Sequence, residues 1–133
     1  DNLMEIFAGV AIVIRNGKYL AVSRKDDPTA FGFAGGKCEE KNGVLETPEE
    51  CALRELHEET GLVGEIDCLV ISRIDETSGK YSNAYLIKNV TGEISTKEAG
   101  VVAWVDEQTL LDGPFGIYNK ATFKKLKEIR NDF

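Results

Sequence analysis

The chain has 133 residues, a formal net charge of −7 and an apolar content of 42%. This length predicts one domain over residues 1–133, and a domain of this size buries enough apolar surface to fold without disulfides or a structural metal. Proteins that bind nucleic acids usually present a basic face, so the acidic charge argues against a nucleic acid partner. No apolar run in the sequence reaches the length of a membrane span.

The first part of the chain predicts a β-hairpin followed by an extended segment. Residues 6–15 are apolar and rich in β-branched side chains, which is typical of a strand. Asn16-Gly17 predicts a two-residue hairpin turn, and residues 18–23 return as the second strand. Residues 26–29 predict a loop, and residues 31–36 predict a short strand or extended segment that ends in two glycines.

A helix with clear start and stop signals follows over residues 48–60. Thr47 is a suitable N-cap, Pro48 suits the first helical position, and Glu50 completes a capping box. Gly61 provides the C-terminal stop. Apolar side chains at helical spacing predict one buried side, formed by Ala52, Leu53 and Leu56.

The second half of the chain predicts three more strands and two helices. Residues 65–75 and 81–90 read as paired strands, and residues 101–105 as a short buried strand. Asp106 is expected to cap a short helix, and Asn119 to cap a final helix. Strands that surround one central helix and end in a C-terminal helix predict an α/β fold with a mixed sheet between helices.

The most informative feature is a cluster of three carboxylates near the end of the central helix. Glu55, Glu58 and Glu59 stand at positions i, i+3 and i+4 and therefore share one side of the helix. A helix C-terminus disfavours negative charge, and like charges at this spacing repel by roughly 0.2–0.5 kcal/mol per pair. A hard divalent cation would remove both penalties. The spacing therefore favours a metal site, and a solvated acidic helix face is the other interpretation.

Residues 54–62, Arg-Glu-Leu-His-Glu-Glu-Thr-Gly-Leu, resemble the second half of the Nudix box, which reads Arg-Glu-apolar-any-Glu-Glu-any-Gly-apolar. In that family a Glu stands eight positions before the Arg, as Glu46 does here. The segment 35–39, Gly-Gly-Lys-Cys-Glu, is similar to the opening of the box. The family pattern has five residues between Gly and Glu, whereas nine separate Gly36 from Glu46. We therefore expect about four extra residues within 40–45, in the loop before the helix.

The resemblance to Nudix hydrolases of the MutT-like type implies an α/β/α sandwich with a mixed β-sheet. It implies Mg2+-dependent hydrolysis, with Mn2+ as the alternative cation, of a nucleoside diphosphate linked to another moiety. That substrate is a nucleoside triphosphate, a dinucleoside polyphosphate or a nucleotide sugar. Glu55, Glu58 and Glu59 would hold the metal together with a backbone carbonyl of Gly35 or Gly36. Homodimers occur often in the family, so a homodimer is an expectation here.

Further site residues follow from the same resemblance. Glu55 and Glu58 would take part in catalysis, and Arg54 with Glu46 would form the ion pair that orients them. Glu98 is similar to a later Glu that serves some family members as metal ligand or general base; Glu93 competes with it, and an exposed loop acid is an equal interpretation.

Three residues are candidates for contact with the substrate. Arg24 and Lys37 flank the glycine segment, where they would meet phosphate, although solvated surface charge is an equal interpretation. Tyr81 is placed to stack on a base, and packing within a hairpin explains it equally well.

The remaining motifs exclude other chemistries. Cys38, Cys51 and Cys68 are odd in number and widely spaced, which predicts reduced thiols in a cytoplasmic protein. His57 is the single histidine and lies two positions from Glu55, so it points away from the carboxylates, and neither a zinc site nor a Ser-His-Asp nucleophile is supported. Two alternatives to an enzyme stay open: a catalytically silent nucleotide sensor with the same fold, and a structural domain with an acidic helix face.

Overall fold

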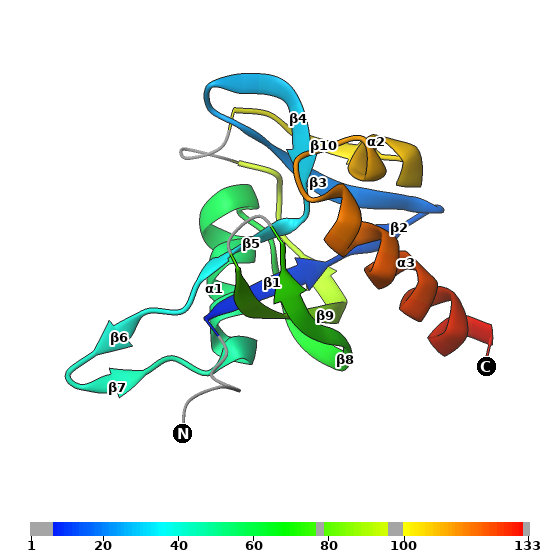
Figure 1. The fold of residues 1–133 in the computed structure, drawn as a ribbon. Coiled ribbons are helices and arrows are strands. Elements are labelled where there is room, and N and C mark those ends of the chain that lie inside the picture. The colour runs from blue at the N-terminus through cyan, green and yellow to red at the C-terminus, as the bar shows by residue number, and fades with distance from the viewer. Residues whose placement is uncertain (1–6, 77–78, 96–99, 132–133) are drawn as a thin grey trace.

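The computed structural model describes residues 7–76, 79–95 and 100–131. Its larger sheet has the strand order β5-β1-β9-β8 (Figure 1). This sheet is mixed, because β1 and β9 run parallel whereas the other neighbours are antiparallel. The strands are β1 (Ala8–Ile12), β5 (Ala34–Lys37), β8 (Val63–Asp75) and β9 (Lys80–Thr91).

A second sheet has the order β10-β3-β2. The strand β2 pairs with the first residues of β3, and β4 pairs with its last residues, Val22 to Arg24. Its strands are β2 (Ile14–Arg15), β3 (Lys18–Arg24), β4 (Asp27–Gly32) and β10 (Val102–Val105). The strand expected over residues 6–15 is therefore two strands, because the chain leaves the first sheet at Val13 and enters the second. The expected hairpin turn is present, with positive φ at Asn16 and Gly17. The expected loop at 26–29 is wrong in part, since β4 already begins at Asp27.

The central helix is α1 (Pro48–Thr60), and its bounds match the sequence prediction. The Thr47 side chain accepts from the backbone of Glu50, whose side chain accepts from the backbone of Thr47, so the predicted capping box forms. Gly61 ends the helix with φ of 82°, a left-handed conformation that favours glycine.

Two further helices follow β10. Asp106 caps α2 (Glu107–Leu111) as predicted. The final helix, α3 (Gly116–Asn131), begins before the expected cap. The backbone N–H of Asn119 donates to Phe115 O, so Asn119 lies inside the helix instead of capping it. No helix in the described part of the chain has the length and apolarity that a membrane crossing requires.

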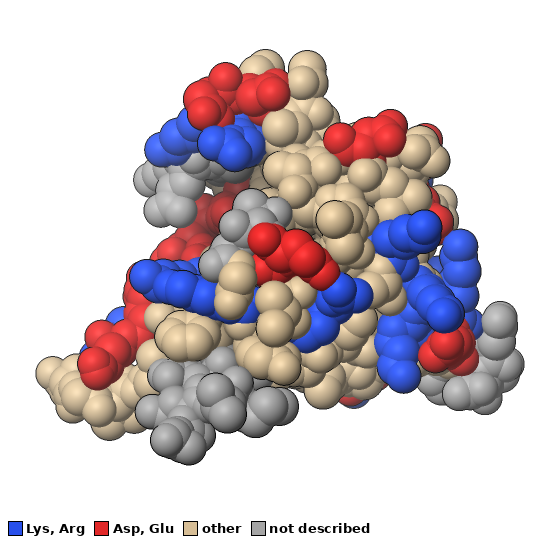
Figure 2. All heavy atoms as spheres, viewed as in Figure 1, with Lys and Arg blue, Asp and Glu red and all other residues tan. Residues whose placement is uncertain are grey.

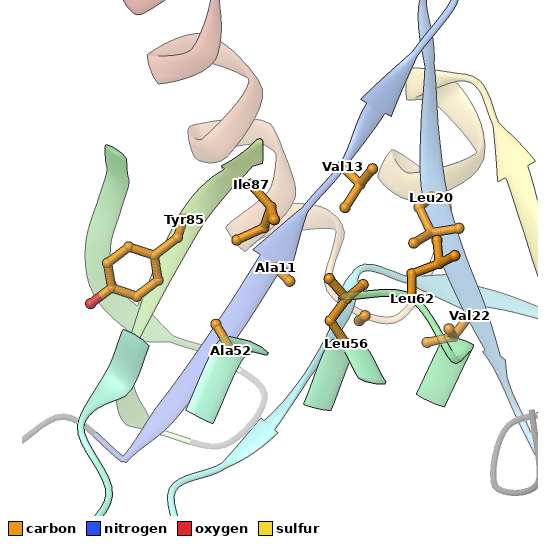
Figure 3. Packing of buried hydrophobic residues seen from close by; sticks show 10 residues of the cluster. Ala11, Val13, Leu20, Val22, Ala52, Leu56, Leu62, Tyr85 and Ile87 are labelled. Atoms are coloured by element: carbon orange, nitrogen blue, oxygen red, sulfur yellow. The ribbon is translucent and has the colours of Figure 1, made fainter. Parts of the chain in front are cut away.

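The helices cover opposite faces of the sheets, as the alternation along β1 shows. Ala11 and Val13 pack with Leu56 of α1 in one buried cluster (Figure 3), whereas Ile12 packs with Leu126 of α3 in the other. Successive side chains of a strand point to opposite faces, so one strand contributes to both clusters. The result is the predicted α/β/α sandwich, with α1 on one side and α2 and α3 on the other (Figure 1).

The extra residues before α1 form a hairpin of their own, where the sequence predicted a loop. Its strands are β6 (Glu40–Lys41) and β7 (Val44–Leu45), and it extends away from the body of the protein (Figure 1). Asn42 and Gly43 have φ of 54° and 78°, as in the two-residue turns that match strand twist. The Asn-Gly pair is the signal in the sequence that indicates this hairpin.

The packing of α1 leads to a stability prediction. Leu56 is fully buried beneath the sheet, so Leu56→Ala should lower the free energy of unfolding by about 2–5 kcal/mol. Leu69→Ala is the matched control, because Leu69 is 49% exposed and should change that free energy by less than about 1 kcal/mol. Urea unfolding followed by the fluorescence of Trp104 measures both; equal losses would contradict this packing.

Candidate active site

Arg54 lies at the centre of a network that joins α1 to the segments before it. Its Nε and Nη2 bond both carboxylate oxygens of Glu46 at 2.7 and 2.9 Å. Nη1 bonds Glu58 Oε1 at 2.8 Å, and Nη2 donates to the backbone carbonyl of Lys37 at 3.0 Å. The side chains of Arg54 and Glu46 are only 16% and 12% exposed. One guanidinium therefore fixes the relative positions of β5, the chain before α1 and one carboxylate of α1.

The electrostatic state of this pair is well defined. The Arg54 hydrogen bonds hold the pKa of the Glu46 carboxyl below its usual range, against the opposing effect of burial. The same bonds raise the pKa of Arg54, with the nearby charges of Glu55 and Glu58 acting in the same direction. Glu46 and Arg54 are therefore both charged at neutral pH.

The inserted hairpin does not disturb Glu46, because its two ends meet. The backbone N–H of Glu46 donates to Glu39 O at 2.8 Å, and the N–H of Glu39 donates to Glu46 Oε1 at 3.1 Å. The strands β6 and β7 continue this pairing outward from the base. Four extra residues thus lengthen a protrusion and leave Glu46 beside Arg54.

The three carboxylates of α1 all face β5 or Arg54. Glu59 Oε1 accepts from the backbone N–H of Gly35 at 2.8 Å. The carboxylate of Glu55 lies so close over Gly36 that any Cβ there would overlap it. Glu58 is held by Arg54, and Glu55 Oε2 lies 3.7 Å from the same guanidinium. Figure 2 shows acidic atoms gathered in a recess between the β3–β4 tip and β5. In the same view of Figure 1, the C-terminal end of α1 lies at this place.

The donor set suits a hard cation, although no group of three or more acidic, His or Cys side chains in the described residues already has metal-site geometry. All three side chains offer carboxylate oxygens, the ligand type that Mg2+ prefers. Gly36 supports the fit, since its missing side chain leaves the space that the Glu55 carboxylate fills. Metal binding would require Glu58 and Glu59 each to turn one carboxylate oxygen toward a shared centre, with Glu58 still in contact with Arg54.

A cavity of about 520 Å3 lies directly beside the glycine segment. Its walls come from the start of the chain, β5, the β8–β9 hairpin and α3. Aromatic side chains form much of it, namely Phe7, Phe33, Phe115 and Tyr118. Polar side chains complete it, namely Lys37, Asp75, Lys80, Ser82 and Asn119. Apart from Lys37, none of these residues could be predicted from the sequence to contact the substrate, because they are far apart along the chain.

Asn119 is the most constrained polar group of this cavity. It is 2% exposed, and its amide nitrogen donates to Leu110 O at 3.1 Å. This bond fixes the orientation of the carboxamide in the cavity wall. On the opposite side, the Lys80 ammonium lies 5.1 Å from the centre of the Phe7 ring.

The other predicted substrate residues lie in different places. Lys37 lines the cavity, and its carbonyl is bound by Arg54. Arg24 is exposed and pairs with Asp26 at 3.0 Å, in the β3–β4 tip. Tyr81 is half-buried in β9 and is not part of the cavity wall, unlike its neighbour Ser82. Glu98 falls outside the described residues, so its predicted role stays a prediction.

Comparison with known proteins gives a family match over most of the chain. The model of the NUDIX domain family matches residues 6–126. A CTP pyrophosphohydrolase of Escherichia coli K12 is 29% identical over 118 residues, which cover 85% of this chain and 83% of that protein. The solution structure of the E. coli ORF135 protein is 27% identical, with a TM-score of 0.73 and coverage of 96% and 94%. The crystal structure of a MutT NUDIX hydrolase from Burkholderia pseudomallei is 26% identical, with a TM-score of 0.66 and coverage of 89% and 95%.

The lowered pKa of Glu46 predicts a pH-dependent stability. A carboxyl whose folded pKa is depressed contributes stability above its unfolded pKa of about 4.3, and that contribution is lost as pH falls through the folded pKa. Glu46→Gln should therefore show a smaller drop in unfolding free energy between about pH 6 and about pH 3 than the wild type. Glu40→Gln, at an exposed acid of β6, serves as control and should follow the wild-type curve. Identical curves for Glu46→Gln and wild type in urea titrations would disprove this assignment.

Proposed function

The chain belongs to the NUDIX domain family and is a Nudix pyrophosphohydrolase of nucleotide-linked substrates, and we propose that it hydrolyses a nucleoside triphosphate in a Mg2+-dependent reaction. The observation that carries this proposal is the aromatic cavity of about 520 Å3, which adjoins the glycine segment faced by the carboxylates of α1. A base held in that cavity would place its phosphates beside those carboxylates. Dinucleoside polyphosphates and nucleotide sugars are the competing substrates.

Glu55, Glu58 and Glu59 would hold the metal, with Mn2+ as the alternative ion. The pairing of β5 with β1 favours the Gly35 carbonyl over that of Gly36 as a further ligand. Gly36 O accepts the Cys51 thiol at 3.2 Å, whereas the N–H of Gly35 donates to α1. The N–H and C=O of one strand residue point to the same side, so the Gly35 carbonyl also faces α1.

When bound, Mg2+ neutralises phosphate charge and lowers the pKa of a coordinated water. The protein orients the groups that act with it. Glu46 fixes the Arg54 guanidinium through two bonds, and Arg54 in turn positions Glu58. A carboxylate oxygen of Glu58 or Glu55 accepts the proton of the attacking water. The apolar wall of the cavity excludes bulk water from the base, and Lys37 at its rim meets phosphate oxygen.

The chemistry of the cavity favours a base with an exocyclic amino group. Aromatic rings such as Phe33 and Phe115 offer surfaces for a flat base. The fixed carboxamide of Asn119 presents an oxygen, which accepts a hydrogen bond from an amino group. A keto group has no hydrogen to donate to that oxygen. CTP, the substrate named for the E. coli relative, carries such an amine at C4, so we infer CTP as the first substrate to test.

The other sequence-based expectations are retained within the proposal. The partner is a small-molecule nucleotide, the expected location is the cytoplasm, and nucleic acid is not expected as a partner. A homodimer stays a prediction, and its test is the molecular mass in solution.

The role of the α1 carboxylates is tested by Glu58→Gln. The substitution keeps the size and removes the charge, so hydrolysis of CTP with Mg2+ should fall by at least about 100-fold while the fold is retained. Glu49→Gln, in the first turn of the same helix, is the matched control and should stay within a few-fold of wild type. Activity of Glu58→Gln within a few-fold of wild type, read by chromatography of the products, would remove this residue from the mechanism.

The metal requirement is tested on the wild-type protein. Chelation should abolish turnover, and Mg2+ together with a non-hydrolysable nucleotide should raise Tm, because a ligand of the folded state stabilises it. A sensor module would show the same Tm increase and no turnover. A structural domain would show neither effect.

The role of Asn119 is tested by comparing CTP with UTP, whose C4 carries a keto group. Loss of one hydrogen bond in Asn119→Ala should lower kcat/KM for CTP by about 10-fold and leave UTP nearly unchanged. Since Asn119 is buried and bonded to Leu110, a thermal melt must accompany the kinetics. Equal losses for both nucleotides in a folded variant would indicate a structural role alone.

A further inference from the structure

A second cavity, of about 250 Å3, adjoins the first one. The first cavity begins at β5, where Gly35 and Lys37 border it, and neither of these residues borders the second. Asp75, Phe115 and Tyr118 border both cavities. Asp75 ends β8, which forms the edge of the larger sheet opposite β5. The three shared residues therefore form a partition at the end of the first cavity that is remote from the glycine segment.

The members of this partition differ in how firmly the fold holds them. Tyr118 is 4% exposed, and its hydroxyl donates to Ser82 O at 2.9 Å. Asp75 is held at the hairpin end of β8, where its backbone carbonyl accepts from the N–H of Gly79 at 2.7 Å. Phe115 stands before the first residue of α3 and is 38% exposed. Phe115 is therefore the least enclosed side chain of the partition.

The Phe115 ring lies on the end of β4, at a position without a side chain. A Cβ added to Gly32 would come within 3.2 Å of Phe115 Cδ2, so the ring packs directly on the glycine backbone. The Phe115 carbonyl accepts from the N–H of Asn119 at 2.8 Å, which places the two residues one helical turn apart. Both border the first cavity. The ring is thus a close neighbour of the residue proposed above to bind the amino group of a base.

We propose that Phe115 is a specificity-determining residue, which limits the length of the base so that single-ring bases are accepted and two-ring bases are rejected. This inference rests on the function proposed above, with the phosphates beside the glycine segment and the base in the first cavity. A base in that orientation directs its amino group toward the partition. The fused second ring of adenine carries this group farther from the sugar, so adenine meets the Phe115 ring and cytosine stops short of it.

Removal of the ring joins the two cavities through their shared wall. The cavity of about 520 Å3 then opens into the one of about 250 Å3, and the second ring of adenine enters the added space. CTP and ATP are suitable probes, because both carry an exocyclic amino group on the side of the base away from the sugar. Either base can donate to the Asn119 oxygen, so the comparison isolates the size of the ring system.

The test measures kcat/KM for CTP and ATP with Mg2+ in the wild type and in Phe115→Ala. The wild type should prefer CTP by about 10-fold or more, and Phe115→Ala should raise kcat/KM for ATP by about 10-fold through a lower KM. CTP should lose a few-fold, since a ring contact is removed. Ile74→Ala is the matched control, because Ile74 is 44% exposed, adjoins Asp75 and borders neither cavity. It should keep the wild-type preference.

A second readout does not require turnover. Calorimetry of CMP and AMP binding should show tighter AMP binding to Phe115→Ala than to the wild type. Thermal melts verify that each variant is folded, and Phe115→Leu, with a smaller loss of volume, should give an intermediate preference and decides the question if Phe115→Ala does not fold.

The outcomes separate this inference from the function on which it rests. A wild type that hydrolyses neither CTP nor ATP contradicts the proposed function, and the CMP and AMP affinities then still measure the effect of the partition. A wild type that hydrolyses CTP, with an unchanged preference in the folded Phe115 variants, overturns the role of Phe115 alone. Equal losses for CTP and ATP, or a wild type without preference between them, overturn it as well.

Discussion

The guanidinium of Arg54 is the interaction on which the active site depends. It reaches Glu46, Glu58 and the Lys37 carbonyl from one largely buried position, and so joins three separate stretches of chain. An arginine suits this task because its planar donors fix direction as well as distance. The positive charge of Arg54 also offsets part of the repulsion among the α1 carboxylates. It offsets as well the unfavourable effect of placing negative charges near a helix C-terminus.

The core determines where this network stands. The strand β1 supplies apolar side chains to both faces, so α1 is anchored through Leu56 on one side while α3 packs on the other. With α1 anchored by its apolar side, its acidic side must face β5 and the glycine segment. Glycine at position 36 allows the Glu55 carboxylate to lie close to β5, because a Cβ there would occupy the place of that carboxylate. On the other face, α3 brings Tyr118 and Asn119 to the cavity beside that segment.

The inserted hairpin shows how the family spacing can change without loss of the ion pair. The chain leaves at Glu39, turns at Asn42-Gly43 and returns at Glu46, where both ends are hydrogen-bonded to each other. Extra length added to a surface hairpin costs little, because the entropy of closing a loop grows slowly with its length. The position of Glu46 is set by its contact with Arg54 and by the hairpin base, and not by the count of intervening residues.

The sequence by itself determined the local elements and the chemical nature of the site. Thr47, Pro48 and Gly61 set the bounds of α1 because caps act over a few residues, and Glu55, Glu58 and Glu59 share a side because helical spacing is fixed. Only the tertiary structure decided that residues 8–15 divide between two sheets and that Asn119 lies inside a helix. It alone gathered the cavity from four distant segments, with Lys37 as the one wall residue already assigned to substrate. These features depend on packing between residues that are remote along the chain, and local propensity carries no information about such contacts.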